Sequence, residues 1–190
     1  MADSAGTASD TTFDVVILGG GSGGYACALR AAQLGLNVAL VEKGELGGTC
    51  LHRGCIPTKA LLHAAEVADS SRESEQFGVR ATFEGINMPA VNDYKDGVVA
   101  RLYKGLQGLV KSRKVTYVEG MGRLVGPTTV EVDGQRYEGR HIVLATGSEA
   151  VVPPVPGLIS SVTGLVTPVA CHIALVVHKL YRRRTLRMPP

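Results

Sequence analysis

The first 12 residues lack both features of a targeting sequence. They have no basic start and no apolar core, and their charged residues are Asp3 and Asp10. A secretory signal and a mitochondrial presequence are therefore excluded on sequence grounds. We expect residues 1–12 to form a flexible N-terminal tail.

Cysteine is also scarce, with four residues in a chain of 190. This number and spacing do not suit a secreted scaffold held by disulfides. The sequence therefore favours a reducing, cytoplasmic location, where a disulfide is usually catalytic or redox-sensing.

Acidic residues are absent from Ile159 onward, although this segment carries five of the 20 basic residues. The net charge of +3 thus divides into a mildly acidic body and a basic tail. This pattern is a shift of composition and does not indicate a nucleic-acid surface. Residues 159–190 fit three interpretations: a truncated or out-of-frame end without an evolved role, a poor membrane anchor over 159–177, and an interaction tail. We expect the first, because the composition of this segment differs from that of residues 1–158. Membrane attachment is a weaker prediction, because Pro168 and His172 interrupt the apolar run.

Glycine, in contrast, is abundant, with 24 residues beside an apolar fraction of 45%. Such a composition and length are typical of one glycine-rich α/β domain. The apolar run Phe13–Leu18 predicts a strand buried on both faces. Gly19-Gly-Gly-Ser-Gly-Gly24 follows at once and matches Gly-x-Gly-x-x-Gly at Gly19, Gly21 and Gly24.

An alanine-rich helix over 25–34 and a second apolar strand over 37–41 complete a strand–turn–helix–strand unit. Glu42 then stands 18 residues after Gly24, where an acid can accept hydrogen bonds from a ribose hydroxyl. In this setting the glycines allow the backbone to approach a pyrophosphate at the helix N-terminus. The unit predicts dinucleotide binding but does not distinguish FAD from NAD.

Cys50 and Cys55 lie five residues apart in the stretch Gly47–Lys59, which reads Gly-Gly-Thr-Cys-Leu-His-Arg-Gly-Cys-Ile-Pro-Thr-Lys. On a regular α-helix this separation places the Cα atoms about 8.7 Å apart. A disulfide requires about 7 Å or less. If the two cysteines are bonded, the backbone between them must depart from a regular helix, for which Gly54 is suited. Pro57 fits the first turn of a new helix.

The remaining pattern predicts helices, short strands and one buried cysteine. Cys27 is expected to pack as a small apolar side chain in the first helix. Asp133-Gly134 indicates a hairpin turn. Gly120 and Gly122 mark either a bulge or a close approach of the backbone to an adenine. The expected helices are 58–68 and 89–111, with weak strand character over 77–83, short strands over 115–118, 122–125 and 129–132 and at Tyr137, and a buried strand over 141–144.

The stretch Gly47–Lys59 resembles the redox-active disulfide motif of the flavin-dependent pyridine nucleotide disulfide oxidoreductases. Within that family, Leu51 and the run Ile56–Leu62 are most similar to the dihydrolipoamide dehydrogenases. The resemblance covers about Phe13–Leu158, and residues 159–190 have no counterpart in it. It implies an α/β, Rossmann-like FAD-binding domain over 13–158, in which a parallel sheet with helices carries a small antiparallel meander. The short strands from 115 to 137 are expected to form this meander. The resemblance also implies that the domain is incomplete at its C-terminus.

The same resemblance implies the site. Cys50 would be the outer cysteine of a Cys50–Cys55 disulfide, which a dithiol substrate attacks, and Cys55 the inner thiolate beside the flavin. Lys59 would lie near the flavin, and Ala145-Thr-Gly-Ser148 would return the chain to it. The implied cofactor-binding residues are Gly19, Gly21, Ser22, Gly23, Gly24, Glu42, Lys43, Gly48, Thr49, Cys50, Cys55, Lys59, Gly122, Ala145, Thr146, Gly147 and Ser148.

The implied reaction converts dihydrolipoamide and NAD to lipoamide and NADH, with FAD as the bound cofactor. Its partner would be the lipoyl domain of a 2-oxo acid dehydrogenase complex, and members of the family are homodimers. A second fingerprint for NAD, the dimerisation domain and the catalytic His with its orienting Glu have no counterpart in these 190 residues. We therefore expect little or no NAD-linked activity from this chain alone.

Three alternatives remain. The chain could be a non-catalytic FAD-binding fragment, or it could belong to a mercuric or mycothiol-type reductase, because these share most of the motif. A metal site of Cys50, His52, Cys55 and His63 is disfavoured because the spacing is not a zinc pattern. On sequence grounds both histidines are expected at the surface, and no metal is predicted.

Overall fold

The computed structural model describes residues 11–148 as a six-stranded sheet with helices packed against it. Predictions for residues 1–10 and 149–190, including the tail after Leu158, lie outside the described residues. The strands are β1 (Thr11–Leu18), β2 (Val38–Glu42), β3 (Thr116–Glu119), β4 (Arg123–Gly126), β5 (Thr129–Val132) and β6 (Gln135–Leu144). The helices are α1 (Ser22–Gln33), α2 (Gly48–His52), α3 (Cys55–Arg72) and α4 (Met88–Ser112), with a 3-10 turn at Ser74–Phe77.

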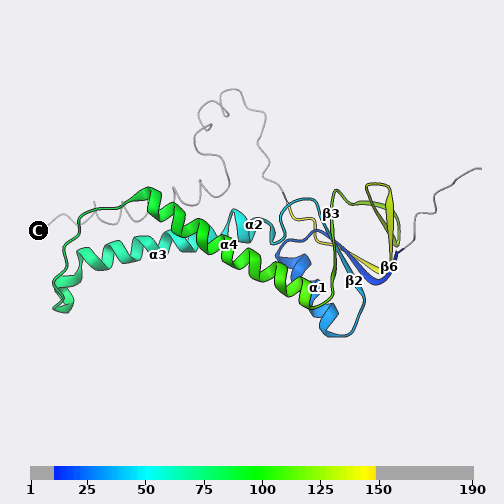
Figure 1. The fold of residues 1–190 in the computed structure, drawn as a ribbon, viewed down its shortest axis with the longest axis horizontal. Coiled ribbons are helices and arrows are strands. Elements are labelled where there is room, and N and C mark those ends of the chain that lie inside the picture. The colour runs from blue at the N-terminus through cyan, green and yellow to red at the C-terminus, as the bar shows by residue number, and fades with distance from the viewer. Residues whose placement is uncertain (1–10, 149–190) are drawn as a thin grey trace, which may run out of the picture.

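The sheet has the order β3-β2-β1-β6-β5-β4. Parallel pairing joins β3, β2, β1 and β6, and antiparallel pairing joins β6, β5 and β4. This arrangement confirms the predicted Rossmann-like α/β class. Figure 1 shows the sheet at one end of the molecule and the long helices α3 and α4 running away from it.

Both faces of β1 and β2 are buried, as their continuous apolar runs predict. Alternate residues such as Ile17 and Leu40 face α1 and the end of α4, in a cluster that includes Ala28 and Val110. The intervening Val16 and Val41 pack against Val130 and other residues of the meander. The antiparallel strands therefore cover the sheet face opposite the helices.

Two strand predictions were wrong in their pairing. The segment 115–118 was expected in the antiparallel meander, but β3 pairs in parallel with β2, with Tyr117 opposite Leu40. Tyr137 and the run 141–144 were expected as separate strands, but β6 is continuous and pairs with β5 and with β1. A single strand thus joins the meander to the parallel sheet. The predicted Asp133-Gly134 turn is confirmed, because both residues have positive φ and β5 and β6 pair directly across them.

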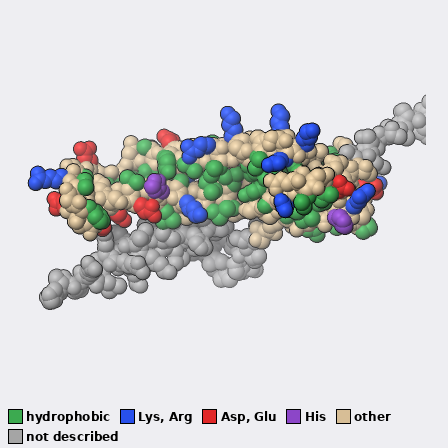
Figure 2. All heavy atoms as spheres, turned by 90° about the horizontal axis from the view of Figure 1, so that it is seen from below, with side chains coloured by type: hydrophobic (Ala, Val, Ile, Leu, Met, Phe, Trp, Pro, Cys, Tyr) green, Lys and Arg blue, Asp and Glu red, His purple; other side chains and the backbone are tan. Residues whose placement is uncertain are grey.

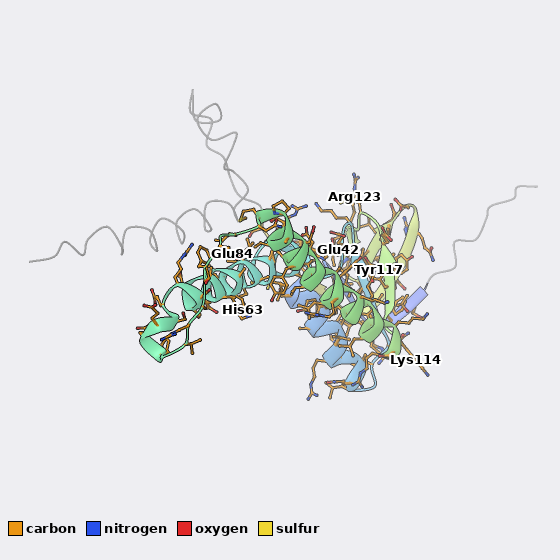
Figure 3. The ribbon with its side chains drawn as sticks, turned by 60° about the vertical axis from the view of Figure 1, so that its left-hand side comes forward. Glu42, His63, Glu84, Lys114, Tyr117 and Arg123 are labelled. Atoms are coloured by element: carbon orange, nitrogen blue, oxygen red, sulfur yellow. The ribbon has the colours of Figure 1, made fainter. Side chains whose placement is uncertain are left out.

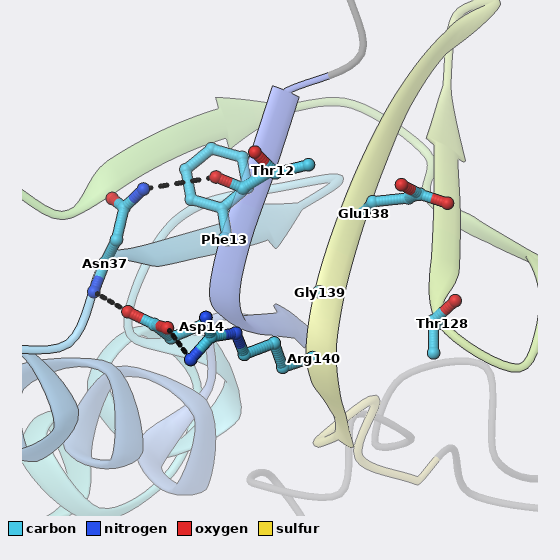
Figure 4. A pocket seen from close by; sticks show the side chains of 8 residues that line it. All are labelled: Thr12, Phe13, Asp14, Asn37, Thr128, Glu138, Gly139 and Arg140. Atoms are coloured by element: carbon cyan, nitrogen blue, oxygen red, sulfur yellow. Dashed lines mark hydrogen bonds and ion pairs between the residues drawn. The ribbon is translucent and has the colours of Figure 1, made fainter.

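Polar residues at the start of β1 contact neighbouring segments at the end of the sheet away from the glycine turn (Figure 4). The Asn37 backbone N–H donates to Asp14 Oδ2 at 2.9 Å, and its side-chain amide donates to the Thr12 carbonyl oxygen at 3.2 Å. Arg140 on β6 forms an ion pair with Asp14 at 3.4 Å. These contacts join β1 to β6 and to the residue before β2, at the end of the sheet opposite the glycine turn.

The helices α3 and α4 form a pair that extends beyond the sheet (Figure 1). Asn87 caps α4 by accepting a hydrogen bond from the Ala90 N–H at 3.2 Å. The expected strand character over 77–83 was wrong, because Phe77 ends the 3-10 turn, Gly78 has φ 74°, and no regular element follows until α4. Several apolar side chains of the pair are exposed, including Val67, Tyr94 and Leu102. Figure 2 shows apolar side chains along the length of one face of the molecule.

Truncation of a valine tests this account of the core. Val38 is 1% exposed in β2, whereas Val67 is 57% exposed on α3. We expect Val38→Ala to lower the free energy of unfolding by about 2 kcal/mol, through lost burial and a residual cavity. The matched Val67→Ala should change it by less than about 0.5 kcal/mol. Urea unfolding followed by circular dichroism measures both, and equal losses would contradict the assigned core.

Candidate functional site

The predicted glycine turn joins β1 to α1 at the carboxyl end of the sheet. A Cβ on Gly24 would clash with the Gly19 carbonyl oxygen, and a Cβ on Gly19 with the Ala145 carbonyl oxygen. Gly19 also has φ 106°, in the region that favours glycine. The turn is therefore a close approach of three backbone segments, which side chains would prevent.

The N-terminus of α1 begins in this turn without a side-chain cap. Gly21 is the N-cap residue and its first turn carries no acidic side chain. The first N–H groups of an α-helix have no partner within the helix, and together with the helix dipole they favour an anion. Gly23 has nothing within 4 Å of an added Cβ, so the space outside this turn is open. These observations fit a pyrophosphate at the predicted position.

Glu42 ends β2, as predicted, and its carboxylate ties two loops together. The Gly20 N–H donates to Oε2 at 2.6 Å and the Gly44 N–H donates to Oε1 at 2.9 Å. Each carboxylate oxygen can accept more than one hydrogen bond. Acceptance from a ribose hydroxyl thus stays a prediction that the geometry permits.

A cavity of about 160 Å³ lies beside Glu42, at the carboxyl ends of β1 and β2. It brings together five of the predicted cofactor-binding residues with four that the sequence analysis did not assign to the cofactor. The predicted residues in its lining are Gly19, Glu42, Lys43, Gly122 and Thr146, and the others are Leu18, Val41, Gly120 and Met121. A Cβ on Gly122 would lie 2.8 Å from Val41 Cγ1, so close packing on the strand ends already requires this glycine.

Tyr117 on β3 was missed by the sequence analysis. Its hydroxyl donates to the Gly44 carbonyl oxygen at 3.4 Å, next to the segment that carries Glu42 (Figure 3). Burial, followed by repulsion from the charges of Glu119, Tyr103 and Glu42, raises the pKa of Tyr117 to about 12. The hydroxyl therefore remains a donor at neutral pH. The pairing of β3 with β2 would have indicated that Tyr117 lies near Glu42. Local sequence does not reveal that pairing.

The two cysteines lie on either side of a helix break. Cys50 is in α2, Arg53 is its C-cap residue, and α3 begins at Cys55. Gly54 between them has φ −122° and ψ −107°, outside the helical region. The departure from regular helix that a Cys50–Cys55 bond needs is thus present at the expected glycine. Pro57 lies in the first turn of α3, also as expected.

Both cysteines are free thiols here. Cys50 is half-buried and Cys55 is exposed. The hydrogen bond with Cys55, then burial and the charge of Cys55, raise the pKa of Cys50, while the Ser22 hydroxyl acts in the opposite direction. Cys50 is therefore a protonated thiol at neutral pH.

Close backbone packing brings the cysteine helix against the glycine turn. The Gly47 N–H donates to the Gly20 carbonyl oxygen at 2.9 Å. A Cβ on Gly48 would lie 2.8 Å from the Gly21 Cα atom, and Gly48 itself has φ 59°. The Ser22–Cys50 contact lies across this junction. The cysteine helix and the N-terminus of α1 thus meet at one junction.

His52 was expected at the surface, and this prediction was wrong. Its side chain is 13% exposed, and its Nε2 lies 2.9 Å from the Leu46 carbonyl oxygen. His63 is 62% exposed, as expected. Among residues 11–148, no group of three or more His, Cys, Asp or Glu side chains could hold a metal ion.

The remaining predicted residues lie on α2, on α3 and in the loop after β6. Thr49 and Lys59 are exposed, and Lys59 follows Cys55 by one helical turn. Gly147 has φ 74° in the loop after β6, and Ser148 is the last described residue. Cys27 is half-buried and packs against the core between the sheet and α1.

The described helices include none long and apolar enough to cross a membrane.

Comparison with known proteins shows the family. The sequence profile of the family described as "Pyridine nucleotide-disulphide oxidoreductase" matches residues 13–179. That match extends past Leu158, and the predicted boundary there stays a prediction.

Three curated relatives show the same family. The chain is 49% identical over 140 residues to a dihydrolipoyl dehydrogenase of Chlamydia trachomatis, covering 72% of this chain and 30% of the relative. It is 46% identical over 157 residues to the Bacillus subtilis dihydrolipoyl dehydrogenase, covering 76% and 33%. It is 45% identical over 152 residues to a leghemoglobin reductase of Glycine max, covering 76% and 29%. The chain thus spans about a third of the length of these relatives, and it belongs to the pyridine nucleotide-disulphide oxidoreductase family of enzymes.

Proposed function

We propose that this chain is the FAD-binding, disulfide-bearing part of a dihydrolipoyl dehydrogenase. The observation that carries the proposal is the contact of α2 with the glycine turn, at Gly48 and Gly21, which brings the cysteine pair to an anion-binding helix N-terminus. The similarity to dihydrolipoyl dehydrogenases supports the choice of substrate. The reaction would be dihydrolipoamide and NAD to lipoamide and NADH.

The cofactor would be held by the residues at the carboxyl ends of β1 and β2. The N–H groups at the start of α1 would bind the pyrophosphate, and Glu42 would accept from the ribose. Gly122 and Thr146 would border the same cavity of about 160 Å³. When bound, FAD supplies a two-electron acceptor between the dithiol and NAD. No NAD site is proposed on the described residues.

The cysteines would exchange electrons with the substrate by two thiol–disulfide steps. One substrate thiolate attacks Cys50 Sγ of the Cys50–Cys55 disulfide, forming a mixed disulfide and releasing the Cys55 thiolate. The second substrate thiolate then attacks the substrate sulfur of the mixed disulfide, which yields lipoamide and releases Cys50 as a thiolate. This thiolate takes up a proton that the substrate dithiol has released. Because α3 begins at Cys55, its N-terminal dipole would stabilise the released thiolate.

The structure leaves Cys55 more exposed than Cys50 on the polypeptide alone. The assigned roles require the opposite order of access, and a flavin beside Cys55 would cover it. The roles of outer and inner cysteine are therefore part of the proposal and need a direct test. Binding to the lipoyl domain of a 2-oxo acid dehydrogenase complex, and dimerisation, belong to the same proposal for the whole enzyme.

Flavin binding by Glu42 is tested by charge removal. Glu42→Gln should weaken FAD binding about tenfold, because the amide has one accepting oxygen where the carboxylate has two. Glu138→Gln is the matched control, since Glu138 is exposed at the end of the sheet opposite Glu42 (Figure 4). Titration of FAD fluorescence measures both affinities. Equal affinity of wild type and Glu42→Gln would remove Glu42 from the site.

The roles of the cysteines are tested by trapping. Oxidised lipoamide is added to the reduced chain, and the mixed disulfide is located by mass spectrometry. We expect Cys55→Ser to accumulate the adduct on Cys50, because the resolving thiol is absent, while Cys27→Ser should behave as wild type. An adduct that forms faster on Cys55 of Cys50→Ser would reverse the two roles.

NAD reduction by the isolated chain is the third test. We expect no NADH formation from dihydrolipoamide above the rate without protein, because these 190 residues contain neither a second glycine fingerprint nor an assigned catalytic base. A full-length dihydrolipoyl dehydrogenase serves as the positive control. Robust NADH formation would show that the chain is catalytically sufficient and would overturn this part of the proposal.

A further inference from the structure

His52 lies beside the cysteine pair, and the proposed chemistry does not use it. It is the last residue of α2, two residues after Cys50 and three before Cys55. Its side chain is 13% exposed, so most of the ring is shielded from water. A largely shielded polar ring needs hydrogen-bond partners.

The ring of His52 has two close partners on the side away from solvent. Nε2 lies 2.9 Å from the Leu46 carbonyl oxygen, and because a carbonyl only accepts, Nε2 carries the proton. The ring also meets Tyr103 of α4 edge to face, with centroids 5.0 Å apart and planes at 77°. A third contact, Nδ1 to Glu45 Oε2 at 3.4 Å, involves an exposed carboxylate and contributes little.

Both partners of His52 belong to the apolar core. Leu46 is 1% exposed and lies in the cluster with Ile17 and Leu40, and Tyr103 packs against the same cluster. His52 therefore ties the end of α2 to the apolar core. The next two residues, Arg53 and Gly54, leave the helix before α3 begins at Cys55.

We propose that His52 is a positioning residue that fixes the spacing of the Cys50 and Cys55 sulfurs and thereby sets the equilibrium between the dithiol and the disulfide. The inference rests on the proposed function, because it requires that the two cysteines form a redox pair. The stability of a disulfide depends on the effective concentration of one thiol at the other, which falls when their relative position is free. Loss of the His52 contacts should therefore favour the dithiol.

The equilibrium is measured against glutathione. The two thiols give two electrons and two protons to glutathione disulfide, which forms the Cys50–Cys55 disulfide and two molecules of glutathione. The 190-residue chain is equilibrated in buffers of stated glutathione ratio, quenched by alkylation and analysed by mass spectrometry. Thermal unfolding of each variant shows whether it is folded.

Two substitutions separate the hydrogen bond from the ring. His52→Phe keeps an aromatic ring against Tyr103 but removes the donor to Leu46, and His52→Gln places an amide N–H near the position of Nε2. We expect His52→Phe to lower the equilibrium constant for disulfide formation about tenfold, a potential about 30 mV less negative for two electrons. His52→Gln should retain more of the wild-type constant than His52→Phe does. His63→Phe is the matched control, because His63 is 62% exposed on α3.

The possible failures are distinguishable. If the wild-type chain oxidises at Cys50–Cys55 and folded His52→Phe keeps its constant within a factor of two, the role of His52 is wrong while the redox pair stands. A shift of equal size in His63→Phe would also overturn it, because the effect would not depend on the contacts of His52. If the wild-type chain forms no Cys50–Cys55 disulfide in oxidising glutathione, the redox pair and the role of His52 fail together.

Discussion

The close backbone approach between the glycine turn and α2 is the constraint on which the site depends. Gly21 and Gly48 allow the start of α1 and the cysteine helix to meet, and the Gly47–Gly20 hydrogen bond fixes their relative position. The turn itself closes because Gly19 and Gly24 leave no Cβ between β1, α1 and the loop after β6. The N-terminus of α1 and the cysteine pair are neighbours for this reason, and a side chain at these positions would separate them.

The parts of the fold that local sequence determines were predictable. The unit from β1 to β2 combines apolar runs with a glycine turn, and the Asp133-Gly134 hairpin has its own turn chemistry. Strand pairing was not predictable in the same way, because three α-helices, α2, α3 and α4, lie between β2 and β3 in the chain. The short apolar run at 115–118 has the same local pattern in a meander and in a parallel sheet.

The same distinction holds for the site. The residues of the turn, Glu42 and the cysteine pair could be predicted from their spacing, and their role in a site stays a prediction. Tyr117 and His52 were missed because their surroundings come from distant segments: Tyr103 is 51 positions after His52, and Gly44 is 73 positions before Tyr117. From the sequence, a histidine between two cysteines is expected at the surface. Only the position of α4 shows that Tyr103 contacts its ring. The contacts of single polar side chains with distant segments are thus the part of the site that most requires the structure.

The central claim is that the cysteine pair and the bound flavin share one site, and the absorption spectrum of the FAD-loaded chain tests it most directly. Reduction of the disulfide by two electrons should leave a Cys55 thiolate against oxidised flavin. Such a pair of electron donor and acceptor gives a long-wavelength charge-transfer band. We predict that this band appears in the wild-type chain and is absent in Cys55→Ser. Bound FAD whose spectrum is the same in both proteins after reduction would contradict the claim.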